Sequence, residues 1–322
     1  MRRILVPLDG SPLARWALPW ALALRAALRG EVELVAVHSP LDIDWGPAAE
    51  GVWNVEVRKA EEATLAAEAT RIEEAGHPRP STLLLERAPG PAIVGRAAET
   101  DADVIVMATH GRGGVSRAWL GSVASYVVRH ADALVLIVHP VDDGTQPDLR
   151  ALPLVDTILM PVDGSRFAEA ATPHAAELAQ AFEAGIVLMR AVATPYIVGS
   201  PYMPQGTRMY AEERERRLAT ANDYLQNIET RIEAPGAVRS IVAETEAAHA
   251  IPAVAEEEGA DLVVMATHGR GALLRTIVGS VADKVMRTSP VPVLLVRPER
   301  QELESTPAEE ATLEVAPPGP VM

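Results

Sequence analysis

Short apolar runs alternate with longer amphipathic segments along most of the chain. The runs at 3–6, 32–37, 82–85 and 104–107 consist mainly of Val, Ile and Leu, which is typical of strands in a buried sheet. The segment 55–74 is the clearest of the longer ones and has a helical pattern with Glu and Arg interspersed. Strands that alternate with helices predict a parallel sheet with right-handed crossovers, and therefore an α/β fold.

Capping signals and the same patterns predict the other elements of the first half. Ser11 followed by Pro12 predicts a helix start, with serine as the N-cap and proline at the first helical position, and this helix should end before Gly30. The apolar run at 104–107 is nearly continuous, so we expect that strand to be buried on both faces. The remaining expected elements are helices at 91–99 and 122–129 and a last strand at 134–138.

The second half of the chain repeats the first. The segment 102–113 recurs as 260–271 with two of its twelve positions changed, both between aliphatic residues. The segment 4–11 recurs as 158–165 in the same order along the chain. Such a repeat indicates a duplicated domain, so we expect two tandem domains, each an open five-stranded parallel sheet.

The repeat also divides the chain. We expect a first domain at 1–142, a linker at 143–153 and a second domain at 154–298. The remaining segment, 299–322, is rich in Glu, Pro and Ala, and this composition predicts a disordered acidic tail.

Charge and composition narrow the possible functions. A formal net charge of -15 repels phosphate backbones, so we expect no nucleic-acid partner. The chain has no cysteine, which excludes disulfides, thiolate metal sites and thiol redox chemistry. The first apolar run is too short for a secretory signal, and no window is long and apolar enough for a membrane span. We therefore expect a cytoplasmic protein with no membrane partner.

Candidate chemistry gathers where two of the predicted strands end, because open parallel sheets bind ligands at the carboxyl ends of their strands. The segment 7–11 reads Pro-Leu-Asp-Gly-Ser, and 161–165 repeats it as Pro-Val-Asp-Gly-Ser. A carboxylate directly after a buried strand is well placed to accept hydrogen bonds from a ligand. The simpler explanation is that Asp9 and Ser11 cap the following helix.

The second place is a glycine-rich loop that follows the strand at 104–107. The loop spans 108–122 and recurs at 266–280, and in each copy nine residues separate an earlier glycine from the final Gly-Ser. Glycine lets backbone N–H groups approach an anion, and the next helix adds unpaired N–H groups and a positive dipole end. Arg112 and Arg270 are candidates for further positive charge. A plain glycine-rich turn is the alternative, but two copies at one spacing favour phosphate cradles.

Other catalytic and metal templates fit less well. A Walker-type lysine motif is absent, and the lysines are Lys59 and Lys284. His110 and His268 have no partner at metal-ligand spacing, so each is interpreted as a structural loop residue. No Gly-x-Ser-x-Gly elbow indicates a hydrolase. We therefore predict no catalytic residue and no metal site within the protein.

The combination of the two motifs resembles the universal stress protein family, over nearly the whole chain in two copies. The resemblance implies, in each domain, a Rossmann-like sheet of the adenine nucleotide alpha hydrolase type with strand order 3-2-1-4-5. ATP, with or without Mg²⁺, would then lie across each switch point. The chain departs from the family pattern at Ala108 and Ala266, where the first glycine is expected. Alanine impairs close approach only if the residue needs a positive φ or touches the ligand.

The resemblance assigns nucleotide-binding roles to residues of both motifs. The base and ribose would lie against the residues that end the first and second strands, and the phosphates against the glycine-rich loop and the helix start. In the first half these residues are Pro7, Asp9, Val37, Met107, Ala108, Gly111, Gly121, Ser122 and Val123. In the second half they are Pro161, Asp163, Val192, Met265, Ala266, Gly269, Gly279, Ser280 and Val281.

Three functions are open at this point. The leading hypothesis is a stress-response regulatory module that binds ATP and hydrolyses it slowly or not at all. A nucleotide-independent interaction scaffold is the alternative, and a nucleotide-hydrolysing or adenylyl-transferring enzyme is the third. The resemblance also implies pairing through the last strands, 134–138 and 293–296, within one chain as a mimic of a dimer, with a homodimer as a further possibility.

Overall fold

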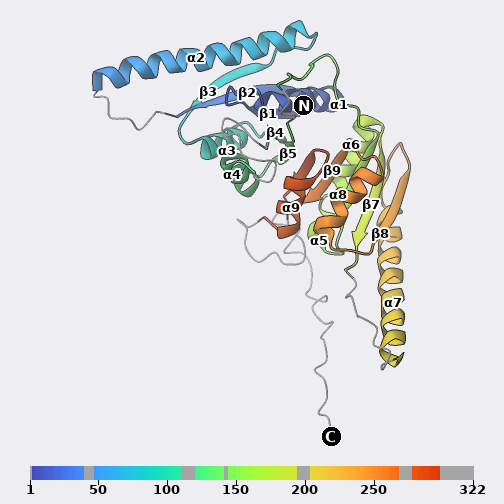
Figure 1. Ribbon diagram of the computed structural model, residues 1–322. Coiled ribbons are helices and arrows are strands. Elements are labelled where there is room, and N and C mark those ends of the chain that lie inside the picture. Colours follow the sequence, from blue (N-terminus) through green and yellow to red (C-terminus); the bar gives the residue numbers. More distant parts are fainter. Residues whose placement is uncertain are drawn as a thin grey trace.

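Ten strands form one continuous sheet in the order β3-β2-β1-β4-β5-β10-β9-β6-β7-β8 (Figure 1). The structure is a computed structural model of the chain and describes residues 2–39, 47–109, 120–140, 144–193, 204–267 and 278–297. In the first half the elements are β1 (Arg3–Pro7), η1 (Ala14–Trp16), α1 (Ala17–Leu28), β2 (Glu31–His38), α2 (Pro47–Glu74), β3 (Ser81–Glu86), α3 (Pro89–Glu99), β4 (Val104–Ala108), α4 (Ser122–His130) and β5 (Leu134–Val138). In the second half they are β6 (Thr157–Pro161), α5 (Arg166–Glu169), α6 (Thr172–Phe182), β7 (Gly185–Ala191), α7 (Pro204–Glu229), β8 (Val238–Ala243), α8 (Ala247–Glu257), β9 (Leu262–Ala266), α9 (Ser280–Thr288) and β10 (Val293–Val296).

Each half keeps the strand order expected of it. Within a half the neighbouring strands are parallel, and the first strand lies between the second and the fourth. The predicted α/β fold is therefore confirmed. The two sheets are not separate, however, because β5 and β10 pair antiparallel and join the halves into one mixed sheet. The predicted pairing of the last strands within the chain is confirmed as well.

The seam between the halves consists of buried aliphatic residues. Leu136 lies opposite Leu294, and both are at most 2% exposed. Beside the strands, His139 Nε2 lies 2.7 Å from the carbonyl oxygen of Met286, across the seam. Pairing satisfies the N–H and C=O groups that would otherwise form two open strand edges. The edges of the joined sheet are β3 and β8.

Helices cover both faces of the sheet. α1, α2, α6 and α7 pack on one face, where Leu18, Ile72 and Leu225 belong to one buried cluster. α3, α4, α8 and α9 pack on the other face, with Ile93 and Val285 in a second cluster. This division follows from right-handed crossovers, because the chain moves one way along the sheet through the first three strands of each half and the other way afterwards. The central strands β4 and β9 are buried at every residue, as the apolar run predicts for β4.

The helix predicted to follow Ser11 is divided in the structure. The 3-10 turn η1 comes first and α1 begins at Ala17, so the α-helix starts later than a serine N-cap at Ser11 predicts. Ser11 still acts as a cap for the turn, because its Oγ accepts a hydrogen bond from the Ala14 N–H at 3.2 Å. Pro19 lies in the first turn of α1, where a helix needs no backbone N–H.

The helix α2 also differs from its prediction. It begins at Pro47 and not near residue 55, and both α2 and α7 extend past the sheet in Figure 1. Side chains are described from residue 54 in α2 and from residue 210 in α7. The C-terminal part of α2 is the part that is fixed to the sheet, since Leu65, Ala69 and Ile72 are buried there. The predicted tail at 299–322 lies outside the described residues.

Candidate functional site

The strands β1 and β4 are not paired with each other at their carboxyl ends, and the region between these two ends is called the first crevice below. Their ladder joins Ile4 to Val104 and Leu5 to Ile105, although both strands continue beyond these pairs. The ladder between β6 and β9 has the same two-pair form. Here the strand order reverses, because β1 is followed in the sheet by β2 on one side and β4 by β5 on the other. This is the switch point at which open α/β sheets bind ligands.

Asp9 follows β1 on one side of the first crevice. Its Oδ1 accepts a hydrogen bond from the Ser11 N–H at 2.9 Å, which stabilises the turn into η1. Asp163 has the same place in the second half, where Oδ1 accepts from the Ser165 N–H at 2.9 Å and from its hydroxyl at 2.6 Å. These aspartates therefore stabilise the turn into the following helix, as the simpler explanation from the sequence predicts. A carboxylate accepts several hydrogen bonds, so this role is compatible with ligand binding.

The N-terminus of α4 forms the other side of the first crevice. Gly121 is its N-cap, and the Gly121 N–H donates to the Thr109 carbonyl oxygen at 2.9 Å, which closes the base of the loop between β4 and α4. Gly279 and Thr267 make the same bond at 2.9 Å in the second half. Ser122, the first residue of α4, is exposed, and the N–H groups of this first turn have no acceptor within the helix. The N–H groups of both helix starts are therefore suited to bind an anion.

Part of the predicted loop falls outside the described residues. This applies to Gly111 and Gly269, which are both predicted site residues, and to His110, His268, Arg112 and Arg270. Ala108 and Ala266, in contrast, are the buried last residues of β4 and β9. Neither is among the residues with a positive φ, so alanine in place of the family's glycine causes no backbone strain there.

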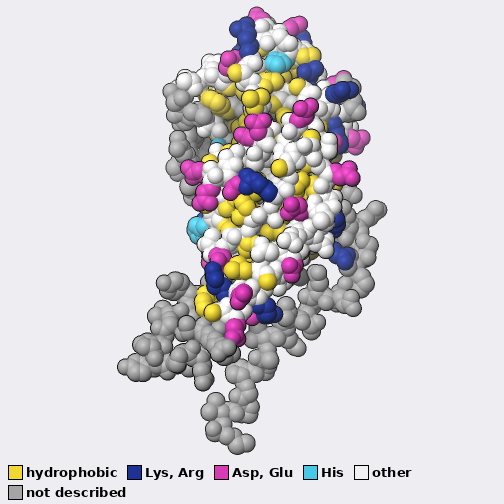
Figure 2. All heavy atoms as spheres, turned by 90° about the vertical axis from the view of Figure 1, so that its right-hand side faces the viewer, with side chains coloured by type: hydrophobic (Ala, Val, Ile, Leu, Met, Phe, Trp, Pro, Cys, Tyr) yellow, Lys and Arg dark blue, Asp and Glu magenta, His cyan; other side chains and the backbone are white. Residues whose placement is uncertain are grey.

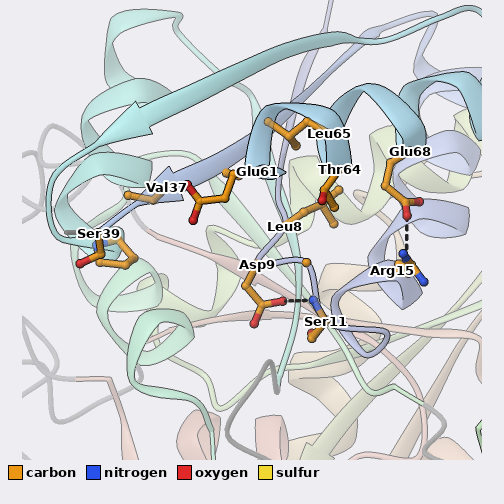
Figure 3. A pocket seen from close by; sticks show the side chains of 13 residues that line it. Leu8, Asp9, Ser11, Arg15, Val37, Ser39, Glu61, Thr64, Leu65 and Glu68 are labelled. Carbon is orange, nitrogen blue, oxygen red and sulfur yellow. Dashed lines mark hydrogen bonds and ion pairs between the residues drawn. The ribbon is translucent and has the colours of Figure 1, made fainter. Parts of the chain in front are cut away.

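A cavity of about 420 Å³ lies beside Asp9 in the first half (Figure 3). Asp9, Ser11 and the end of β2 form one wall, and the helix α2 forms the opposite wall. Its volume is within the range of small-molecule sites, roughly 300–1,000 Å³. Of the predicted site residues, Asp9 and Val37 line it. The complete lining is Leu8, Asp9, Gly10, Ser11, Arg15, Ala36, Val37, Ser39, Glu61, Thr64, Leu65, Glu68 and Pro89.

A buried carboxylate lies at the inner end of this cavity. The side chain of Glu68 is 6% exposed, and its Oε1 lies 2.7 Å from Nε of Arg15. Its Oε2 lies 3.3 Å from Nη1 of Arg71, one helical turn further along α2. Burial lowers the pKa of Arg71, and the Glu68 carboxylate opposes this change. Glu68 therefore balances two partly buried guanidinium groups.

A second buried polar group lies where β2 ends. His38 is 3% exposed, and its Nδ1 and Nε2 each lie 2.8 Å from an oxygen, Oε2 of Glu61 and Oδ1 of Asn54 respectively. Both oxygens belong to α2. These contacts hold α2 against the end of β2 and fix one wall of the cavity.

Sequence reasoning missed the contribution of α2 to this cavity. Glu61, Thr64, Leu65 and Glu68 recur at helical spacing and line it together, while Leu65 also belongs to the core. The available signal was an apolar stripe interrupted by acidic residues on the same helix face. Such a stripe predicts burial, but it does not say which strand end the helix covers.

One predicted correspondence between the halves is wrong. The ladders pair Pro7 with Val35 and Pro161 with Met189, so the residue that matches Val37 is Ala191 and not Val192. Val192 lies one position later, just past the end of β7, and its N–H donates to the Ala243 carbonyl oxygen at 2.8 Å. A side chain moved by one position along a strand points to the other face of the sheet.

The parts of the chain that the structure describes give little indication of other kinds of site. In these parts no group of three acidic or histidine side chains is placed to hold a metal ion. None of the described helices combines the length and the apolar character needed to cross a membrane. Figure 2 shows acidic, basic and apolar side chains interspersed over the face that lies at the right of Figure 1.

The fold and the paired crevices define a class: doubly wound α/β proteins that hold a ligand where the strand order reverses. The model of the universal stress protein family matches residues 1–139 and again residues 155–297. The chain therefore belongs to the universal stress protein family.

Curated relatives and solved structures of the same length agree with this membership. Universal stress protein Rv2005c of Mycobacterium tuberculosis is 29% identical over 306 residues, which cover 91% of this chain and 96% of the relative. A putative universal stress protein from Pseudomonas aeruginosa superimposes with a TM-score of 0.62 at 20% identity, over 94% of this chain and 95% of that one. A universal stress protein from Archaeoglobus fulgidus gives a TM-score of 0.62 at 21% identity, over 93% and 97%. At these identities the two structures support the fold alone.

Proposed function

We propose that the chain binds ATP at the switch point of each half and acts as a stress-response regulatory module in the cytoplasm. One observation carries this proposal. In both halves the short ladder between the first and fourth strands leaves a crevice, with a carboxylate on one side and the start of a helix on the other. These two sides suit the two ends of a nucleotide.

The helix starts supply the phosphate side. Backbone N–H groups of Ser122 and Val123 lie in the first turn of α4, where they and the helix dipole favour negative charge, and the N-cap Gly121 adds no side chain in front of them. Ser280 and Val281 have the same place at the start of α9, after the N-cap Gly279. Mg²⁺, where present, would arrive with the phosphates, because a magnesium ion is commonly held by phosphate oxygens and water.

The ends of the first two strands supply the base and ribose side. Pro7 ends β1 and Val37 is partly exposed in the cavity wall, so both offer apolar contacts to a flat ring. Asp9 offers acceptors to the donors of a base or a ribose. The matching residues in the second half are Pro161, Ala191 and Asp163.

The chemistry of these residues favours binding over turnover. Lys59 is paired with Glu56 at 3.1 Å on the outside of α2, and Lys284 lies 2.6 Å from Nε2 of His249. Neither is placed like a lysine that holds transferring phosphates in a P-loop. We therefore expect ATP hydrolysis to be slow or absent, so that ATP acts by setting conformation or partner choice.

The test is isothermal titration calorimetry of the full chain with ATP, with and without Mg²⁺. Ser122→Asp and Ser280→Asp are the informative variants, because a carboxylate at the start of a helix stabilises the helix and yet repels phosphate. Ser122→Asn and Ser280→Asn are the matched controls, since they change size without charge. We expect each Asp variant to weaken ATP binding at its own site by about tenfold or more, and each Asn variant by much less.

The interaction scaffold makes the opposite prediction. If the unmodified chain shows no heat with ATP and no co-purified nucleotide, ATP binding is refuted and the scaffold replaces it. If ATP binds but the Asp and Asn variants behave alike, the phosphates do not lie at the helix starts.

A further inference from the structure

The two halves have different side chains around equivalent crevices. The strand ladders place Arg190 of β7 where the first half has Ala36, because Val35 and Met189 hold equivalent positions. The buried stripe of α7, Ala221, Leu225 and Ile228, matches Leu65, Ala69 and Ile72 of α2 in spacing and burial. Ala69 and Leu225 are therefore equivalent, and so are the residues directly before them, Glu68 in the first half and Tyr224 in the second.

A third wall position changes together with these two. Arg15 follows Asp9 at the same distance at which Glu169 follows Asp163. In the first half Arg15 pairs with Glu68 at 2.7 Å. In the second half the hydroxyl of Tyr224 donates to Oε1 of Glu169 at 3.0 Å. The same two positions therefore contact each other in both halves, through an ion pair in the first half and through a hydrogen bond from a tyrosine hydroxyl to a carboxylate in the second.

Arg190 and Tyr224 contact each other in the second half. The guanidinium carbon of Arg190 lies 4.7 Å from the centre of the Tyr224 ring, within the range of a cation–π contact. Glu169 is held in turn by Arg231 at 2.9 Å. Burial raises the pKa of Tyr224, and both Glu169 and Asp163 lie close enough to raise it further. Arg190 and Tyr224 are equivalent to Ala36 and Glu68, which line the cavity beside Asp9, so this cluster corresponds to the walls of that cavity.

The first half keeps the corresponding space open. Ala36 and Glu68 both line the cavity of about 420 Å³, and the small side chain of Ala36 occupies little of that room. A long arginine and a ring at these two positions would contact each other across that room, as they do in the second half.

We propose that the two halves are unequal nucleoside sites: the first accepts the base in its cavity, and Arg190 with Tyr224 closes the equivalent space in the second. This deepens the proposed function and rests on it for the identity of the ligand. The first cavity combines apolar walls at Leu8 and Val37 with acceptors on Asp9 and Glu61. Such walls select a flat heteroaromatic ring that carries hydrogen-bond donors, as the amino group of adenine does.

The test uses adenosine and ATP as separate probes of the full chain, in calorimetry and equilibrium dialysis. Ala36→Arg introduces the arginine of the second half into the wall of the first cavity, and Arg190→Ala removes that arginine from the second half. Ala66→Arg is the matched control for added charge, because Ala66 is exposed on α2 and does not line the cavity. Circular dichroism confirms folding, and an arginine already occupies the equivalent strand position in the second half.

We expect one site to bind at least about tenfold more tightly than the other, which corresponds to the loss of one good polar contact or apolar wall. Ala36→Arg should weaken the tighter site for adenosine and for ATP by about tenfold or more, and Ala66→Arg should change neither. Arg190→Ala should strengthen the weaker site.

The outcomes separate this proposal from ATP binding as such. Two equal ATP sites, or a tight site that Ala36→Arg leaves unchanged, would overturn the inequality and leave ATP binding intact. Adenosine binding that Ala36→Arg abolishes, without any ATP binding, would support the cavity and overturn the ATP assignment. If neither probe binds, both proposals are wrong.

Discussion

Replacing Glu68 by glutamine tests whether the buried charge at the inner end of the cavity stabilises the first half. Glutamine keeps the shape of the side chain and removes its negative charge. Arg15 and Arg71 then face each other without the carboxylate that lies 2.7 Å from one and 3.3 Å from the other. The two guanidinium groups already disfavour each other, since Arg15 adds to the lowering of the Arg71 pKa by burial.

The size of the effect follows from burial. Removing one partner of a buried ion pair costs about 3–5 kcal/mol. The arginine side chains are 23% and 28% exposed, so water screens part of their repulsion. We therefore expect Glu68→Gln to lower the free energy of unfolding by about 2–3 kcal/mol. At about 2–4 °C per kcal/mol for a domain of roughly 150–250 residues, Tm should fall by roughly 5–10 °C.

The assay is thermal and urea unfolding followed by circular dichroism at neutral pH. Glu73→Gln is the matched control on the same helix, because Glu73 pairs with Arg79 at 2.8 Å but is 55% exposed. An exposed pair contributes about 0–1 kcal/mol, so this variant should melt close to the unmodified chain. The reasoning is refuted if Glu68→Gln and Glu73→Gln change the free energy of unfolding by the same amount.

Three further predictions concern single contacts. Ser165→Ala should cost about 1 kcal/mol in urea unfolding, because the Ala168 N–H loses the Ser165 Oγ that accepts it at 3.2 Å; an unchanged midpoint would show that the cap is not needed. Gly90→Ala should lower the free energy of unfolding by about 1–3 kcal/mol, because the Cβ of the new alanine would lie 2.6 Å from Cδ1 of Tyr126. The double variant Gly90→Ala with Tyr126→Lys should regain the melting temperature of the unmodified chain. Burial raises the pKa of Tyr224 above its ordinary value of 10.0, so its contribution to stability is present below pH 10 and is lost as pH rises further. The unmodified chain should therefore lose stability more steeply above pH 10 than Tyr224→Phe does, and parallel pH profiles would contradict this.

Backbone features that depend on local pattern could be predicted from the sequence. The last strand of the first half matches its predicted bounds, Leu134–Val138, because an apolar run between polar turns has few other ways to bury itself. β4 is buried throughout for the same reason. The repeat then transferred each element to the second half, whereas the order of strands came from the resemblance to the universal stress protein family.

Features that depend on contacts between distant segments could not be predicted in this way. The split between η1 and α1 depends on how Ser11 and Asp9 use their side chains in the turn, which a capping rule alone does not decide. The cavity depends on α2 lying over the end of β2, where His38 contacts Glu61 and Asn54. Helical spacing showed a face on α2 without showing its neighbour. The error at Val192 has the same origin, because register is set by the ladder and not by the motif.

Several residues that differ between the two halves are in contact with each other, so that both members of a contacting pair have changed together. Gly90 lies against Tyr126 in the first half, and the equivalent positions of α8 and α9 are Ala248 and Lys284. The wall positions likewise exchange an Arg–Glu contact for a Glu–Tyr contact.

Paired changes preserve packing, because a single exchange would leave a clash or an unbalanced charge in a dense interior. The backbone of the two crevices can then stay the same while their walls differ. The seam between β5 and β10 holds both halves in one sheet. The proposed inequality would therefore place two sites of different affinity in one molecule, which two identical chains paired through the same strands would not offer.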